Sequence, residues 1–400
     1  MKKYNCSFGI VKNIVIVNRF SVKNVVHNFI YANILKNSSI CNVMKKLCVV
    51  FGGPSCEHDI SIITGMQLAK SVSDKYQIEK IYYGLDGCFY LATGVDDLSF
   101  FSKKSRISLK KVCFFEGKVE ILSKFHKKTF EVECVINCCH GGFGENGGLA
   151  SLFEMNGIKY TSSCPLSAGI TMDKYLTKLI VKDIVDVVPG VLIRRGVKLV
   201  DTGAINDLND ELIVKPNSLG SSIGVKFATK GNYTDQVQAI YEIGDDALVE
   251  NYIANMVEYN QACFRDDDGL VVSAIEKPNS KSKILSFDDK YMSKSKTKGG
   301  DRELPAKISA KLQKQISDTT KAIYEKLNIS GVARIDYIYD TKNKVLYFNE
   351  INTVPGSMSF YLYEPIGIDY ISLVERLIAN ANVPRKYKYF ETNVLDGKII

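Results

Sequence analysis

Apolar and polar residues along 47–160 alternate in blocks that predict strands and helices in turn. The uninterrupted apolar run 47–51 is typical of a strand buried on both faces of a parallel sheet. The expected elements are a strand at 47–51, a helix at 59–69, strands at 78–83 and 134–139, a helix at 148–156 and extended chain at 158–160. This order predicts an open parallel α/β domain over 44–162, with loops at the strand ends available for ligands.

A second unit with a different order of elements follows from residue 163. Its expected elements are a helix at 168–184, strands at 211–215, 225–227 and 247–253, and a helix at 309–327. We expect two subdomains, a central one at 163–254 and a C-terminal one at 255–390. In the latter, the polar, glycine-rich segment 291–305 is interpreted either as a lid whose lysines close over phosphates or as an exposed loop.

A β-hairpin is predicted at 332–351, where two strands rich in β-branched and aromatic residues flank a polar turn. Because side chains alternate along a strand, Arg334 and Asp336 share one face. A turn centred near Asn343 gives the cross-strand pairs Asp336 with Glu350 and Arg334 with Asn352. Two carboxylates and an amide on one patch of sheet suit Mg²⁺, and the arginine suits developing negative charge. The alternative is the polar outer face of an ordinary hairpin.

Composition narrows the class of protein. With 400 residues, 46% apolar and 24% charged, the chain has the make-up of a soluble protein of two or three domains. No apolar run reaches the length of a membrane helix, which argues against a membrane protein. The net charge of +8 comes from residues 1–46, which hold eight Lys or Arg and no Asp or Glu, so nucleic acid is not indicated as a partner. Residues 1–43 are expected to be a basic extension outside the fold, which begins near Met44.

The eleven cysteines lie at irregular spacings, which favours a reducing compartment over a disulfide framework. Cys134, Cys138, Cys139 and His140 have two interpretations, a metal site and a buried strand. The paired spacing that is typical of metal-binding cysteines is missing, so we favour the buried strand. His140 also opens a glycine-rich loop directly after that strand.

A loop rich in glycine and serine, at 216–224, joins two predicted strands. Its backbone N–H groups and hydroxyls suit phosphate oxygens, although many such loops are plain turns. Lys215 at its mouth and Lys174 upstream would add positive charge. Glu250 and Glu258 are either acceptors for an adenine amine and ribose hydroxyls or solvated carboxylates.

Taken in order, these segments resemble the D-alanine–D-alanine ligases of the ATP-grasp superfamily over about 44–390. The matching motifs are 51–61, 140–147, Met172–Lys174, 214–216 with 220–224, Lys290–Tyr291, Arg334–Asp336 and Asn349–Gly356. The resemblance implies an ATP-grasp fold, of the α/β class, in which two α+β subdomains clasp ATP. It also implies a cytoplasmic homodimer that joins two D-alanines through a D-alanyl phosphate for peptidoglycan synthesis.

Further roles follow from the resemblance alone. Two Mg²⁺ ions, or Mn²⁺, would be held by Asp336, Glu350 and Asn352. The residues implied for ATP are Lys174, Lys215, Ser221, Ser222, Glu250, Ile253 and Glu258. The residues implied for catalysis are Glu57, Ser221 and Tyr291, as a hydrogen-bonded set near the first ammonium group, with Arg334 and the Gly356 amide as oxyanion donors.

The second substrate is the part that the resemblance determines least. The implied substrate residues are His140, Ser222, Ser357, Ser359, Tyr361 and Leu362. At 360–362 the chain departs from the segment in which many members carry a serine, whereas Tyr291 favours an amine as the nucleophile. The acceptor D-alanine therefore has the alternatives D-serine, D-lactate and another amino acid. A nucleotide-binding protein without ligase activity is a further alternative.

Overall fold

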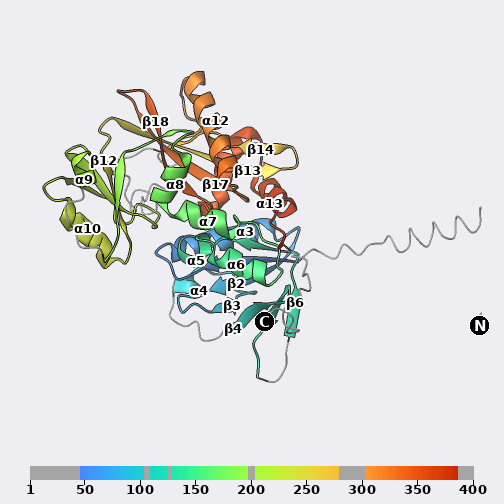
Figure 1. Ribbon diagram of the computed structural model, residues 1–400. Helices are drawn as coiled ribbons and strands as arrows, with labels where there is room; N and C mark the ends of the chain where they lie inside the picture. Colours follow the sequence, from blue (N-terminus) through green and yellow to red (C-terminus); the bar gives the residue numbers. More distant parts are fainter. Residues whose placement is uncertain (1–45, 103–108, 125–127, 197–202, 279–301, 386–400) are drawn as a thin grey trace, which may run out of the picture. The chain divides into compact units, whose positions relative to one another are not determined.

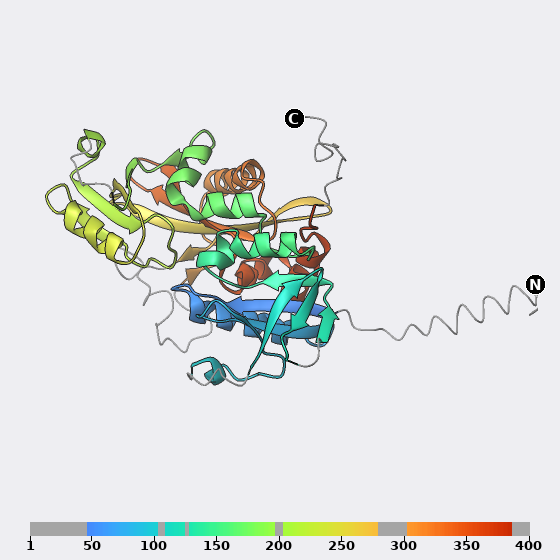
Figure 2. The same cartoon turned by 60° about the horizontal axis from the view of Figure 1, so that its bottom comes forward.

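The computed structural model describes residues 46–102, 109–124, 128–196, 203–278 and 302–385 (Figures 1 and 2). The expected extension 1–43, Tyr291 and most of the expected lid lie outside these ranges. Within them, no helix combines the length and the apolar character that crossing a membrane requires.

The first sheet has seven strands in the order β6-β5-β4-β3-β2-β1-β7. Its strands are β1 (Lys46–Gly52), β2 (Gln77–Tyr83), β3 (Phe89–Leu91), β4 (Lys110–Phe115), β5 (Lys118–Ile121), β6 (Lys128–Glu131) and β7 (Cys134–Asn137). Only β1 pairs in parallel, with β2 and β7, and the other neighbours are antiparallel. The sheet is therefore mixed rather than purely parallel. The connections β2–β3, β4–β5 and β5–β6 have two to six residues, too few for the crossover of a dozen or more residues that parallel pairing needs.

Strand β1 is buried on both faces, as its apolar run predicted. Leu47, Val49 and Phe51 enter one core cluster, which also contains residues of α3 (His58–Val72) and α13 (Tyr370–Ala379). Cys48 and Val50 point to the opposite face and pack in a second cluster with α6 (Gly148–Met155). The buried-strand interpretation of 134–139 is also confirmed, since Cys134, Cys138 and Cys139 are all buried around β7.

The helix predicted at 168–184 is in fact two helices, α7 (Pro165–Met172) and α8 (Lys174–Val181). Asp173 separates them with an extended backbone, and its side chain accepts a hydrogen bond of 2.8 Å from the Leu176 N–H. Aspartate is a favoured N-cap because it satisfies a free N–H at a helix start. The single-helix prediction was wrong because helical spacing continues across this cap.

Two larger sheets carry most of the second half of the chain, and a small two-stranded sheet pairs β15 (Lys277–Pro278) with β16 (Arg302–Glu303). The four-stranded sheet has the order β11-β10-β12-β9, all antiparallel, with β9 (Gly190–Ile193), β10 (Glu211–Pro216), β11 (Lys226–Thr229) and β12 (Ala247–Asn251). The five-stranded sheet has the order β14-β13-β17-β18-β8, with β8 (Asp186–Val187), β13 (Met256–Asp266), β14 (Gly269–Val272), β17 (Ala333–Asp340) and β18 (Val345–Asn352). Helix α10 (Tyr233–Glu242) contacts the first of these sheets, and α12 (Ala310–Lys326) contacts the second.

The predicted hairpin is β17–β18, and its cross-strand pairs are confirmed. Asp336 lies opposite Glu350, and Arg334 lies opposite Asn352. Next to the Asp336–Glu350 pair, on the turn side, Tyr337 lies opposite Phe348. Asn349 is therefore an extra residue in β18, a bulge that shifts the register by one. Bulges re-aim side chains, and this one brings Asn349 and Glu350 into the same pocket.

Candidate active site

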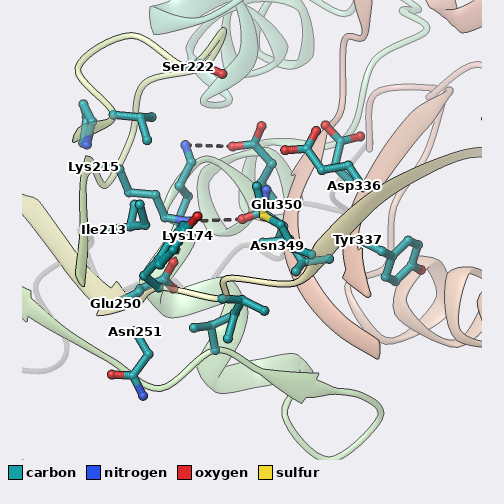
Figure 3. Close-up of a pocket in the computed structure, with 18 of the residues that line it drawn as sticks. Lys174, Ile213, Lys215, Ser222, Glu250, Asn251, Asp336, Tyr337, Asn349 and Glu350 are labelled. Carbon is teal, nitrogen blue, oxygen red and sulfur yellow. Dashed lines mark hydrogen bonds and ion pairs between the residues drawn. The ribbon is translucent and has the colours of Figure 1, made fainter. Parts of the chain in front are cut away.

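A pocket is lined by residues of β10, β12, β13, β17 and β18 (Figure 3). Eight residues that the sequence singled out line this pocket: Lys174, Lys215, Ser222, Glu250, Ile253, Glu258, Asp336 and Glu350. Apolar side chains such as Val188, Ile213 and Ile338 form the rest of the wall. An apolar cavity with a few convergent charged groups is the usual form of a small-molecule site.

Two buried lysines meet the hairpin inside this pocket. Lys174 begins α8, and its Nζ lies 3.4 Å from Glu350 Oε2 and donates to the Leu219 carbonyl at 2.6 Å. Lys215 is the penultimate residue of β10, and its Nζ donates to Asn349 Oδ1 at 3.1 Å. Figure 3 shows both side chains pointing toward β18. Positive charge from α8 and β10 thus faces the carboxylate and amide oxygens of β18.

Glu250 pairs with Lys215 and with a third lysine, Lys178, which the sequence analysis missed. Its carboxylate lies 2.7 Å from Lys215 Nζ and accepts a hydrogen bond from Lys178, which is also buried. Burial lowers the pKa of Lys178 to about 8, although Glu250 partly opposes the change. Burial alone would raise the pKa of Glu250, but the two lysines outweigh it and the pKa is lowered. Glu250 is therefore an ionised, paired carboxylate and not a solvated one.

The donor set of the hairpin fits a hard divalent cation. Asp336 and Glu350 supply two carboxylates, and Asn352 lies close enough for its Nδ2 to donate to Asp336 at 3.4 Å. Arg334 holds the Asp336 carboxylate through two hydrogen bonds of 2.7 and 2.8 Å. Mg²⁺ is usually bound by one or two carboxylates together with substrate phosphates, so these residues fit the ion. No group of three or more His, Cys, Asp or Glu side chains suited to a metal occurs in the described ranges.

The glycine- and serine-rich loop approaches the N-terminal sheet through Glu57. Ser221 donates a hydrogen bond to Glu57 Oε1 across 164 residues of sequence. A Cβ added at Gly220 would lie 2.9 Å from Glu57 Oε2, so a side chain there would displace the carboxylate. Ser221 and Ser222 have φ values of 54° and 58°, a left-handed conformation that costs energy for residues other than glycine. Such strain is typical of functional loops.

His140 links the first sheet to the segment after β18. Its Nδ1 donates to the Val354 carbonyl, and its Nε2 accepts from Thr64 Oγ1 at 2.9 Å. Thr64 Oγ1 in turn accepts from the Ser357 N–H at 3.1 Å. Burial lowers the pKa of His140, which agrees with a neutral imidazole that accepts at Nε2.

Glu145 is a second residue that the sequence analysis passed over. It ends the short helix α5 (Gly142–Glu145), and its two oxygens accept from the N–H groups of Gly141 and Val354, each at 3.0 Å. Burial, reinforced by the negative charge of Glu57, raises the pKa of Glu145 to about 7. Its position as the one acidic residue of the loop 140–147 is the sequence signal that marks it.

The segment implied for the second substrate is well packed. Tyr361 donates to Glu276 Oε2 at 3.1 Å, and the Arg302 guanidinium lies 4.5 Å from the centre of its ring. Ser359 and Leu362 are fully buried, so neither side chain is accessible in this conformation. Ser357, Met358 and Ser359 all have positive φ. A Cβ added at Gly356 would meet nothing within 4 Å, so space is open beside its backbone.

The fold and the pocket together define the class of protein, which is that of ATP-grasp enzymes. Family models for the D-ala D-ala ligase N-terminus and C-terminus match residues 46–163 and 198–379. A D-alanine–D-alanine ligase of Thermosipho melanesiensis is 31% identical over 89% of this chain and 99% of its own length. The chain belongs to the D-alanine–D-alanine ligase family.

Solved structures give the same result. The D-alanine–D-alanine ligase of Helicobacter pylori superposes with a TM-score of 0.69 at 27% identity and covers 84% of this chain and 98% of its own. The VanG D-Ala:D-Ser ligase of Enterococcus faecalis superposes with a TM-score of 0.71 at 25% identity, with the same coverage. The names of these two structural neighbours thus differ in the second amino acid, which is the acceptor substrate.

Proposed function

We propose that this protein is a D-alanine–D-alanine ligase, an ATP-dependent enzyme of peptidoglycan synthesis that acts in the cytoplasm. The observation that carries the proposal is the meeting of Lys174 and Lys215 with Glu350 and Asn349 in one pocket of a chain of this family. Positioned positive charge beside hard oxygen ligands is what phosphoryl transfer requires, because that reaction relies on positioning and charge stabilisation.

ATP would bind with its adenosine against β12 and its phosphates toward the hairpin. Glu250, Ile253 and Glu258 line the pocket at the adenosine end, where Glu250 is held by two lysines. Lys174 and Lys215 would neutralise the phosphates. Ser221 and Ser222 would complete the cradle through their hydroxyls and N–H groups.

Two Mg²⁺ ions, with Mn²⁺ as a substitute, would be held by Asp336, Glu350 and Asn352. When bound, such ions would supply positive charge that offsets the charge developing on the transferred phosphoryl group. Arg334 already binds both oxygens of Asp336. It would therefore fix the orientation of this ligand while it presents positive charge to the reacting carboxyl group.

The reaction then follows from the two substrates. A carboxylate oxygen of the first D-alanine attacks the γ-phosphorus of ATP, the bond to ADP breaks, and a D-alanyl phosphate forms. The neutral amine of the second D-alanine attacks the acyl carbon, a proton is lost, and inorganic phosphate leaves. Glu57 would bind the ammonium group of the first D-alanine, with Ser221 and Tyr291 orienting it, and His140 would line the same site. Arg334 and the Gly356 amide would stabilise the tetrahedral oxyanion.

D-serine is a specific alternative to D-alanine as the second substrate. A neighbour of similar TM-score is a D-Ala:D-Ser ligase, and the serine that many members place against the acceptor is replaced here at 360–362. Tyr361, held by Glu276 and Arg302, offers an aromatic wall beside Arg334. Ser357 would then be the hydroxyl nearest to the acceptor carboxylate. We also propose a division into units 44–162, 163–254 and 255–390, and a homodimer as the working form.

The test is phosphate release from ATP and Mg²⁺ with pairs of D-alanine, D-serine and D-lactate, and with L-alanine as the matched control. We expect release with two D-alanines and none with L-alanine. No release with any D-pair would reject the ligase proposal. A clear preference for D-serine or D-lactate as the second substrate would reject D-alanine as the acceptor and leave the chemistry in place.

A further inference from the structure

Arg302 lies beside the segment that is implied for the second substrate. It belongs to β16, where it pairs with Pro278 of β15. Its guanidinium is 4.5 Å from the centre of the Tyr361 ring, and its Nη1 is 3.1 Å from Glu276 Oε1. Tyr361 in turn donates a hydrogen bond of 3.1 Å to Oε2 of the same carboxylate. The guanidinium is therefore held in one orientation by an ion pair and by a cation–π contact.

Glu276 connects this cluster to the hairpin proposed for the metal. Its backbone N–H and carbonyl both bond with those of Asn260, each at 2.9 Å, and the Asn260 side chain donates to Glu276 Oε2 at 3.3 Å. Asn260 lies opposite Asp336 in the pairing of β13 with β17. Burial alone would lower the pKa of Arg334, but Asp336 raises it, and so do Tyr361 and Glu276. The same two side chains hold Arg302, so its guanidinium lies close to the proposed oxyanion site.

The cations already assigned near the hairpin face other groups. Lys174 and Lys215 face β18 in the pocket proposed for ATP. Arg334 is tied by two hydrogen bonds to a proposed metal ligand. Arg302 differs because its side chain is 42% exposed, whereas the side chain of Glu276 that holds it is 5% exposed. A guanidinium has five N–H donors, so it can keep its contact with Glu276 and bind a second carboxylate through another edge.

The hydroxyl groups of the same segment offer no charge to a carboxylate. Ser359 is fully buried, and Ser357 donates to Gln67 Oε1 at 2.8 Å. At 360–362 the chain also departs from the segment in which many members of the family carry a serine. Arg302 supplies, on the face of the Tyr361 ring, the positive charge that these hydroxyls lack.

We propose that Arg302 binds the carboxylate of the second amino acid and so restricts the acceptor to molecules with a free carboxylate. The contact would consist of two parallel hydrogen bonds from the planar guanidinium, which is the strong geometry for such an ion pair. Glu276 would act through Arg302 as a positioning residue, and Tyr361 would supply the surface on which the guanidinium is stacked. The inference rests on the ligase proposed above and adds the residue that selects its acceptor.

The test is a competition between two acceptors in one reaction of the full chain with ATP, Mg²⁺ and labelled D-alanine. D-alaninamide has the amine of D-alanine but no carboxylate, so it can accept the D-alanyl group without an ion pair to Arg302. The ratio of D-alanyl-D-alanine to D-alanyl-D-alaninamide, separated by chromatography, measures the preference for the carboxylate. At equal concentrations we expect the wild type to favour D-alanine by at least about 20-fold, and Arg302→Gln to lower this ratio by at least about 10-fold, because a charge-assisted hydrogen bond is lost.

Arg376 supplies the matched control. Its side chain is 43% exposed, and its Nη1 lies 2.9 Å from Oδ2 of Asp266, whose side chain is 10% exposed, so this pair resembles that of Arg302 with Glu276. Arg376→Gln should leave the product ratio unchanged. Arg302→Lys keeps the charge without the planar fork and should retain part of the preference. The two acceptors differ in amine basicity, but that difference is the same for every variant and cancels in the comparison.

The outcomes that would overturn the proposal are distinct. One is the same ratio for Arg302→Gln and the wild type, since a merely structural arginine would change the use of both acceptors equally. Another is an equal fall for Arg376→Gln. A ratio that responds to Ser357→Ala and not to Arg302→Gln would place the carboxylate at Ser357 instead. A wild type that makes neither product would reject the ligase itself and this inference with it, whereas both products in an unchanged ratio reject the inference alone.

Discussion

Replacing Glu250 by glutamine should destabilise the fold far more than the loss of an ordinary ion pair. The Glu250 side chain is 4% exposed and pairs with Lys178 and Lys215, which are 5% and 8% exposed. The Glu250→Gln variant keeps the shape but leaves two buried ammonium groups without a counter-charge. Removing one partner of a buried pair costs about 3–5 kcal/mol.

That cost is large compared with the stability of a folded domain, about 5–15 kcal/mol. With a urea m-value of about 3 kcal/mol per M, the unfolding midpoint should fall by about 1–1.7 M. The assay is urea unfolding followed by circular dichroism at pH 7.5. Because the pKa of Glu250 is lowered in the folded state, its contribution is complete above its unfolded pKa and is lost as the pH falls. The measurement at pH 7.5 therefore sees the full effect.

The double variant Glu250→Gln, Lys178→Met supplies the internal control. Replacing Lys178 as well removes one of the two ammonium groups that lose Glu250, so about half of the lost stability should return. The exposed pair Lys314–Asp318, with side chains 77% and 61% exposed, is the matched surface case. Asp318→Asn should cost less than about 1 kcal/mol. A Glu250→Gln cost as small as that of Asp318→Asn, or additive losses in the double variant, would refute the reasoning.

Three further predictions concern the site. Glu350→Gln should lower kcat by at least about 100-fold in an ADP-release assay while the circular dichroism spectrum is unchanged, because the residue pairs with Lys174 and lies opposite Asp336 as a proposed metal ligand. Appreciable turnover would contradict the proposed metal site. Ser221→Ala should raise KM for D-alanine more than KM for ATP, since it frees Glu57, and an effect on ATP alone would speak against that role. The pKa of Glu145 is raised to about 7 in the folded state, so the protonated carboxyl group favours folding. This contribution is lost as the pH rises from the unfolded pKa to about 7. The Tm of Glu145→Gln minus the Tm of the wild type should therefore increase from pH 5 to pH 8. A difference that stays constant over this range would disprove the reasoning.

The hairpin shows how far sequence reasoning can reach. Strand composition and alternation predicted β17, β18 and the pairing of Asp336 with Glu350, because both are local properties of about twenty residues. The bulge at Asn349 was not predicted. It depends on how the strand packs against its neighbours, and it turns Asn349 toward Lys215.

Residues far apart in sequence gave no comparable signal. Lys178 and Glu250 are 72 positions apart, so no local pattern joins them. The spacing of four between Lys174 and Lys178 does place both on one face of a helix and could have drawn attention to the second lysine. The break at Asp173 was missed for a related reason, since a capping aspartate reads as an ordinary polar position in a helical pattern.

The sequence by itself determined the main strands and helices, the metal-type ligands of the hairpin, the phosphate-type loop and the family resemblance. These features are carried by neighbouring residues, and short-range geometry fixes them. Only the tertiary structure decided the charge state of Glu250, the burial of Lys178 and the exposure of Phe143, Met155 and Leu166. Each of these depends on which distant groups share a buried space or are left exposed, and burial is a property of the folded chain.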